Sequence, residues 1–189
     1  FSSITIPEHV RKMDITIRSM LSDIMLCDPE LYEGIINREK DVQRLFLVIA
    51  KAMRKGTENT STLKTLKVSL PELVHYSSIA SSLGHIANDL QRFVRCVRDG
   101  RLSKKGMAAC NHIVGELQNF YLETMKALHK KDKHLAGSLA GWKTKLEEEF
   151  SELSKKNIGE HSVSAICEIS KNILGSTDKL VSRVGEANL

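Results

Sequence analysis

The sequence has few of the residues that interrupt regular structure: three prolines, eleven glycines and only 5% aromatic residues in a chain of 189. Disordered and collagen-like chains are rich in proline and glycine, and sandwiches or barrels need frequent turn residues between short strands. The composition therefore excludes these classes. The longest apolar runs, such as residues 45–50, are also far shorter than the roughly 20 residues that a transmembrane helix needs. We expect no membrane span.

The sequence also lacks the motifs of common catalytic and cofactor sites. It contains no Walker A loop, no G-x-G-x-x-G turn after a strand, no G-x-S-x-G elbow and no H-E-x-x-H zinc motif. Its seven histidines are dispersed, and its four cysteines lack the C-x-x-C spacing of metal sites and redox pairs. We therefore predict a protein that is not an enzyme, binds no cofactor and keeps its thiols reduced in the cytoplasm.

Basic residues outnumber acidic residues by a small margin, 28 against 23, for a net charge of +5. The excess is spread over both halves of the chain, and no block of five or more like charges occurs. Proteins that read DNA usually concentrate positive charge on one face or segment. Direct DNA binding by this chain is therefore not expected.

Helical periodicity, with apolar residues three or four positions apart, runs through nearly the whole chain. Pro7, Pro29 and Pro71 lie where each favours the first turn of a helix. Gly56 favours the end of the second helix, and residues 57–69, rich in Ser, Thr and Asn, predict a loop. The expected all-α fold has six long helices, at residues 7–27, 28–56, 71–100, 103–128, 132–153 and 159–184.

An internal repeat becomes visible when the sequence is aligned with itself at a fixed offset. A displacement of 104 residues places Asp28 on Asp132, so that two predicted helix caps coincide together with several apolar positions. A displacement of 87 residues places the third helix on the sixth. Because equivalent helices recur in the same order, we predict two tandem three-helix bundles, one at residues 1–100 and one at residues 101–189.

Together with the duplicated unit, three segments carry a resemblance to a known family. They are residues 28–31 (DPEL) and 36–46 (INREKDVQRLF) in the second predicted helix, and residues 83–88 (LGHIAN) in the third. On these grounds the chain resembles the PhoU family of phosphate-uptake regulators, and its archaeal members most closely. The resemblance implies a non-enzymatic cytoplasmic regulator that acts on a phosphate transporter, a sensor or a transcription factor through protein contacts.

The resemblance also implies where metal clusters would bind, namely at carboxylates with E-x-x-x-D spacing, since residues i and i+4 project from one helix face. None of the corresponding pairs is intact in this sequence: Glu39 with Gln43, Gly84 with Asn88, Lys143 with Glu147, and Lys171 with Gly175. We therefore predict no metal cluster. Glu39, Asp41 and Glu147 remain as candidate ligands of an adventitious ion.

Two other interpretations stay open. The chain could be a metal-binding helical protein whose carboxylate ligands do not align with the E-x-x-x-D positions of the family. It could also be the C-terminal effector or dimerisation half of a DNA-binding transcription regulator, because some archaeal relatives resemble such fusions and this chain starts at Phe1 rather than at a methionine. Met13, Met20 and Met25 of the first helix suggest a homodimer, because together they occupy a wider part of the helix surface than a single narrow packing seam.

Overall fold

In the computed structural model, which describes residues 5–26, 28–157 and 159–185, every regular element is helical. The predicted all-α class is thereby confirmed for this part of the chain. The helices are α1 (Ile6–Met25), α2 (Tyr32–Glu58), α3 (Thr60–Leu66), α4 (Leu70–Asp99), α5 (Lys104–Lys130), α6 (Lys133–Lys156) and α7 (His161–Ser182), with 3₁₀ turns η1 (Pro29–Leu31) and η2 (Arg183–Gly185). The predicted end of the first helix, at Cys27, lies outside the described residues. None of the described helices is both long and apolar enough to cross a membrane.

Several helices begin where a short polar side chain accepts a hydrogen bond from a backbone N–H group of the first turn. At α1, Thr5 and Glu8 form a reciprocal capping box, in which Glu8 N donates to Thr5 Oγ1 and Thr5 N donates to the Glu8 carboxylate. Ser69 and Glu72 repeat this arrangement at α4. Each box satisfies N–H groups that the helix itself cannot bond. These caps confirm the predicted starts of the first and third long helices.

The start of α2 differs from the prediction. Asp28 is expected to cap this helix, but α2 begins only at Tyr32 and has no side-chain cap. The Asp28 carboxylate accepts a hydrogen bond from Glu30 N at 2.9 Å and so caps η1 instead. At the equivalent place in the second half, Asp132 Oδ1 accepts a hydrogen bond from Leu135 N and does cap α6. The two caps that suggested the repeat therefore begin different structures.

The segment at residues 57–69 contains helix where a loop was predicted. α2 continues past Gly56, and α3 follows after Asn59, whose side chain accepts a hydrogen bond from a backbone N–H in the first turn of α3. Gly56 is buried, and a Cβ at this position would lie 2.7 Å from a methyl group of Leu73 and 2.9 Å from one of Leu63. The missing side chain gives α3 room to pack against α2. Gly56 therefore serves close packing and does not end the helix.

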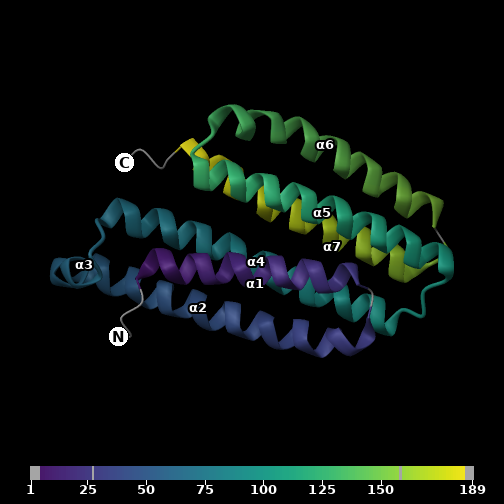
Figure 1. Ribbon diagram of the computed structural model, residues 1–189, viewed down its shortest axis with the longest axis horizontal. Coiled ribbons are helices and arrows are strands. Elements are labelled where there is room, and N and C mark those ends of the chain that lie inside the picture. Colours follow the sequence, from purple (N-terminus) through teal and green to yellow (C-terminus); the bar gives the residue numbers. More distant parts are fainter. Residues whose placement is uncertain (1–4, 27, 158, 186–189) are drawn as a thin grey trace.

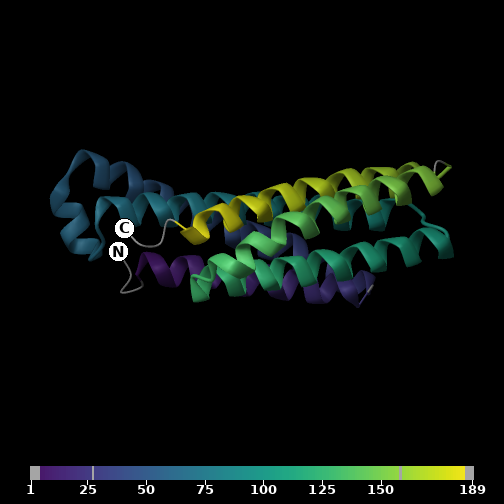
Figure 2. The same cartoon turned by 90° about the horizontal axis from the view of Figure 1, so that it is seen from above.

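The long helices run side by side along one axis of an elongated molecule (Figures 1 and 2). α4 packs against α1, α2 and α7, while α7 also packs against α5 and α6, and α1 reaches α5. The contact between α4 and α7 is as extensive as that between α2 and α4. Buried apolar side chains from all six long helices form one continuous core. The predicted units at residues 1–100 and 101–189 therefore share this core through α4 and α7.

The methionines of α1 do not form an exposed stripe. Met13 and Met20 are fully buried in the core, and Met25 alone among the three is exposed. The observation that suggested a homodimer therefore does not hold in the structure, and dimerisation stays a prediction without this support.

Candidate functional site

The three candidate metal ligands do not come together. Glu39 is buried on α2, whereas Asp41 is exposed on the same helix and forms an ion pair with Arg44 at 2.9 Å. Glu147 belongs to α6, on the opposite side of the molecule from α2 (Figure 1). Within residues 5–26, 28–157 and 159–185, no group of three His, Cys, Asp or Glu side chains is arranged to hold a metal ion. The placement of the three carboxylates does not support a shared ion site.

Other groups occupy places where the resemblance would put paired carboxylates. Where α2 packs against α4, the side-chain amide of Gln43 donates to the carbonyl oxygen of Gly84 at 3.1 Å. Where α6 packs against α7, the Lys143 ammonium lies 3.5 Å from Glu147 and 3.3 Å from Asp178. Burial lowers the pKa of Lys143, but the two carboxylates outweigh burial and raise it above its ordinary value. An amide and a lysine cation thus link these helix pairs.

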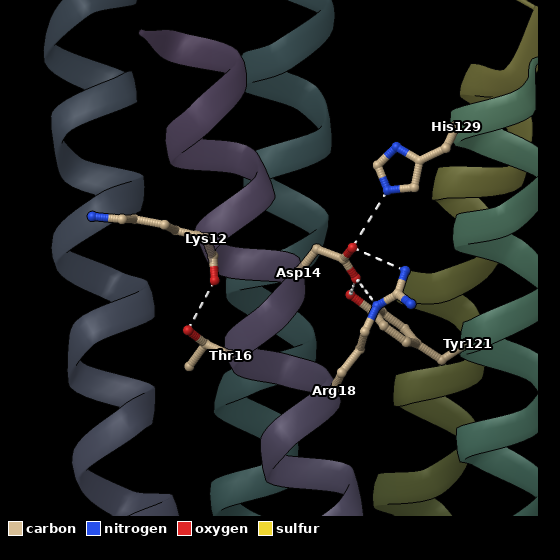
Figure 3. Close-up of polar contacts among 6 residues, drawn as sticks. All are labelled: Lys12, Asp14, Thr16, Arg18, Tyr121 and His129. Carbon is tan, nitrogen blue, oxygen red and sulfur yellow. Dashed lines mark hydrogen bonds and ion pairs between the residues drawn. The ribbon is translucent and has the colours of Figure 1, made fainter. Parts of the chain in front are cut away.

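An ionic cluster around the buried carboxylate of Asp14 joins α1 to α5 (Figure 3). Asp14 is 3% exposed, and its Oδ1 accepts hydrogen bonds from Arg18 Nε and from the Tyr121 hydroxyl, both at 2.9 Å. Its Oδ2 accepts from Arg18 Nη2 at 3.0 Å and lies 3.4 Å from His129 Nε2. Arg18 follows Asp14 by one turn of α1, while Tyr121 and His129 belong to α5. We call these four residues the Asp14 cluster.

The Asp14 cluster keeps its carboxylate charged. Burial by itself raises the pKa of Asp14, but the hydrogen bonds from His129 and Arg18 outweigh burial, so that this pKa lies below its ordinary value. Burial, reinforced by the charge of Asp14, raises the pKa of Tyr121 well above its ordinary value. The Tyr121 hydroxyl therefore stays protonated at physiological pH and acts as a donor to the carboxylate.

The geometry of the Asp14 cluster suits a structural clamp better than a catalytic centre. Each oxygen of the Asp14 carboxylate already has two hydrogen-bond partners, and Tyr121 is 1% exposed. A general acid or base must come within hydrogen-bond reach of the atom whose proton it moves. In this arrangement the Tyr121 hydroxyl is committed to Asp14 and both Asp14 oxygens are engaged, so the cluster ties α1 to α5.

The sequence alone does not single out the Asp14 cluster, although it contains a weak signal. Asp14 follows Met13 directly on the buried face of α1, where a carboxylate is rarely found unless it is paired, and Arg18 is four residues away. The hydroxyl partner, Tyr121, is 107 residues away in the sequence. Only the packing of α1 against α5 reveals this partner.

An apolar groove lies between α1 and α2, on the other side of α1. It has a volume of about 470 Å³ and is lined by Lys12, Ile15, Thr16, Asp41, Arg44, Leu45 and Val48. Ile15 is 56% exposed and Val48 is 38% exposed. Figure 3 shows Lys12 and Thr16 on the side of α1 that faces α2, away from Asp14. Exposed apolar side chains that gather in one place mark binding surfaces more often than scattered ones do. We call this surface the Ile15 groove.

The edges of the Ile15 groove are mainly cationic. Lys12 and Arg44 line the groove directly, and Lys51 and Lys55 follow further along the same side of α2. The acidic residue of the lining is Asp41, whose carboxylate is already paired with Arg44 at 2.9 Å. The groove therefore combines an apolar floor with an excess of positive charge.

Comparisons with known proteins do not supply a relative from which a function could be carried over. No family model matches the chain, and no curated protein and no solved structure matches it significantly. A function for this chain therefore has to rest on its own surfaces and clusters, with the Ile15 groove as the candidate binding site.

Proposed function

We propose that this chain is a non-enzymatic regulatory protein that binds a partner protein through the Ile15 groove. The observation that carries the proposal is the joint exposure of Ile15 and Val48 in one groove with cationic edges. Apolar contacts at the centre of an interface supply affinity, and charges at its rim supply orientation and selectivity. The Asp14 cluster, with its groups already paired, serves stability, so the proposed contact with a partner protein rests on the Ile15 groove.

The partner segment that fits this groove is an amphipathic helix with an apolar stripe and acidic flanks. Two neighbouring helices, α1 and α2, form a groove in which a third helix can place side chains at i, i+3 or i+4, and i+7. Lys12, Arg44 and Lys51 would then face the acidic flanks. A second copy of this chain fits less well at the groove, because it would bring the same cationic edges together.

We further propose that the regulated process is phosphate uptake or phosphate signalling, as the resemblance to the PhoU family implies. The helix packing is consistent with this proposal. Two sets of three long helices follow one another in the chain, and in each set the second helix packs against the third, α2 against α4 and α6 against α7. Such packing suits a duplicated three-helix unit. The partner would be a phosphate transporter, a sensor or a transcription factor.

The test compares the proteins that the purified chain and two variants capture from the native lysate of cells grown with and without phosphate. Ile15→Asp places a carboxylate in the groove, and Val74→Asp makes the same kind of change at a 47% exposed site on α4 outside the groove. We expect one protein to be captured by the wild type and by V74D but not by I15D. Its cross-links should join an acidic helix to α1 and α2, and its yield should change with phosphate supply.

The possible outcomes separate the two parts of the proposal. Equal loss of the captured protein with both variants, or its retention by I15D, would contradict the Ile15 groove as the binding surface. If the captured protein is lost with I15D but its yield does not respond to phosphate, the result would support the Ile15 groove as the binding surface and contradict the phosphate assignment. For the purified complex, we expect the affinity to fall as salt is added, because salt screens the contacts between acidic flanks and cationic edges.

A further inference from the structure

Figure 1 shows that α1 and α4 begin, and α5 ends, at the same end of the molecule. Residues of these three helix ends line a second cleft. It lies between these three helices and has a volume of about 430 Å³. Sites for small organic ligands typically measure about 300–1,000 Å³. The cleft is therefore large enough for a small molecule, and its lining shares no residue with the Ile15 groove.

One wall of this cleft is apolar and preformed. It consists of Val10 from α1, Ile79 from α4, and Met125 and Leu128 from α5, each of which is at most 8% exposed. All four side chains belong to the continuous core, so neighbouring helices hold them in place. Because the protein already covers these four side chains almost completely, the apolar surface open to a ligand comes from the half-buried Pro7 and Tyr76 and the exposed Pro71 of the same lining.

The remaining lining of the cleft is rich in groups that bind anions. Arg11 and Lys131 contribute cationic side chains and His75 contributes an imidazole, whereas the His129 imidazole is already engaged with Asp14. Arg11 is exposed, and among the residues that the structure describes it takes part in no ion pair. A guanidinium group without a carboxylate partner matches the geometry of phosphate and carboxylate groups, which it can bind with two parallel hydrogen bonds.

The carboxylate in the cleft lining and the one in the adjoining hollow are already engaged by other protein groups. Glu72 accepts hydrogen bonds from Ser69 N at 2.8 Å and from Ser69 Oγ at 2.7 Å, and these bonds lower the pKa of Glu72. Asp14, in the hollow that adjoins the cleft at Arg11 and His129, is held by the Asp14 cluster. Neither carboxylate pairs with Arg11, so the guanidinium remains available to an anion.

We propose that this cleft binds a small amphiphilic anion, with an apolar tail against Pro7, Pro71 and Tyr76 and a phosphate or carboxylate head at Arg11. The proposal concerns a small molecule, so it goes beyond the proposed function and does not depend on the Ile15 groove. An inorganic anion would leave the apolar surface of Pro7, Pro71 and Tyr76 uncovered, and a neutral alcohol would leave Arg11 without a partner. Tight binding therefore requires both parts in one molecule.

Isothermal titration calorimetry of the full chain with octyl phosphate, inorganic phosphate and octanol tests this proposal. We expect octyl phosphate, below its micelle concentration, to bind at least about tenfold more tightly than either of the other two probes. Arg11→Gln should lower the affinity for octyl phosphate by about tenfold or more, because the substitution removes a charge-assisted hydrogen bond. The matched control is Arg95→Gln, an exposed arginine near the other end of α4, which should change the affinity by less than about twofold.

Three results would overturn the proposal: no binding of octyl phosphate, equal affinity for inorganic phosphate, or equal weakening by R11Q and R95Q. Methyl-labelled methionine provides a second measurement that does not rely on a variant. The resonance of Met125, in the cleft wall, should shift as octyl phosphate is added, whereas that of Met107, near the opposite end of α5, should not. A shift confined to Met107 would place the ligand elsewhere and contradict the assignment.

Vesicles distinguish a free amphiphile from a lipid head group in a membrane. Phosphatidylcholine vesicles that contain phosphatidic acid present the same kind of anion in a bilayer. The proposal predicts binding of soluble octyl phosphate and no vesicle sedimentation that depends on Arg11. Vesicle binding that R11Q abolishes, without binding of soluble octyl phosphate, would assign the cleft to a membrane surface and overturn the small-molecule site.

Discussion

Removing the carboxylate of Asp14 is the sharpest test of how α1 and α5 are held together. Asp14→Ala leaves the buried Tyr121 hydroxyl without its acceptor, and an unpaired buried polar group costs about 1–3 kcal/mol. Breaking a fully buried ion pair costs about 3–5 kcal/mol. The side chains of Arg18 and His129 are 39% and 52% exposed, so water compensates for much of what they lose. We expect a total loss of about 2–4 kcal/mol in the free energy of unfolding.

Urea unfolding followed by circular dichroism measures this loss, and a thermal scan should show a fall in Tm of roughly 5–15 °C for a chain of this size. Tyr121→Phe provides an internal check of the mechanism. In the wild type, it removes a hydrogen bond to a charged group and should cost about 1–2 kcal/mol. In the Asp14→Ala background, it removes an orphaned hydroxyl and should recover about 1 kcal/mol.

Two results would refute this reasoning. One is a loss for Asp14→Ala no larger than that of the surface control Asp41→Ala, whose exposed pair with Arg44 should contribute less than about 0.5 kcal/mol. The other is a Tyr121→Phe cost that is the same in both backgrounds, since the two groups would then be energetically independent.

The lowered pKa of Asp14 stabilises the fold above the ordinary carboxyl pKa of about 4, and this stabilisation is lost as the pH falls through the lower folded-state value. In urea titrations, the wild type should therefore lose more stability than Asp14→Asn between about pH 5 and pH 2; parallel losses would contradict this. Lys143→Met leaves two carboxylates without their shared cation and should lower the free energy of unfolding by up to about 1 kcal/mol at low salt. Added salt should reduce this difference, because the site is partly exposed. Gly137→Ala, whose new Cβ would have no neighbour within 4 Å, should stabilise the exposed face of α6 by about 0.5–1 kcal/mol. Gly100→Ala would place its Cβ 2.4 Å from the Cys96 carbonyl oxygen and should destabilise the fold by about 1–3 kcal/mol. Shifts in Tm of the same sign for the two glycine variants would contradict the surroundings described for Gly137 and Gly100.

Local signals in the sequence predict helix starts well where a cap and an apolar stripe coincide. Ser103 and Asp132 cap α5 and α6 where the sequence places these helix starts. The signals fail where a capping residue has more than one use, because Asp28 caps a 3₁₀ turn and Asn59 caps the short α3 inside a predicted loop. A capping side chain shows that a nearby N–H group will be bonded, but not how long the following helix will be.

The binding surfaces could be predicted only in part. Ile15 and Val48 lie off the apolar stripes of their helices, and this irregularity is visible in the sequence. Several other exposed apolar residues share it, among them Leu26 and Leu47. The packing of α1 against α2 decides that Ile15 and Val48 meet in one groove, and periodicity within a single helix contains no information about such pairs.

The sequence by itself therefore determined the fold class and the buried face of most helices, because caps and apolar spacing act over a few neighbouring residues. The tertiary structure alone decided that Asp14 meets Tyr121, that Arg11 borders an apolar cleft, and that α4 and α7 join the two halves in one core. The physical reason is that burial and pairing depend on which distant helices come into contact, and this is settled by the packing of the whole chain.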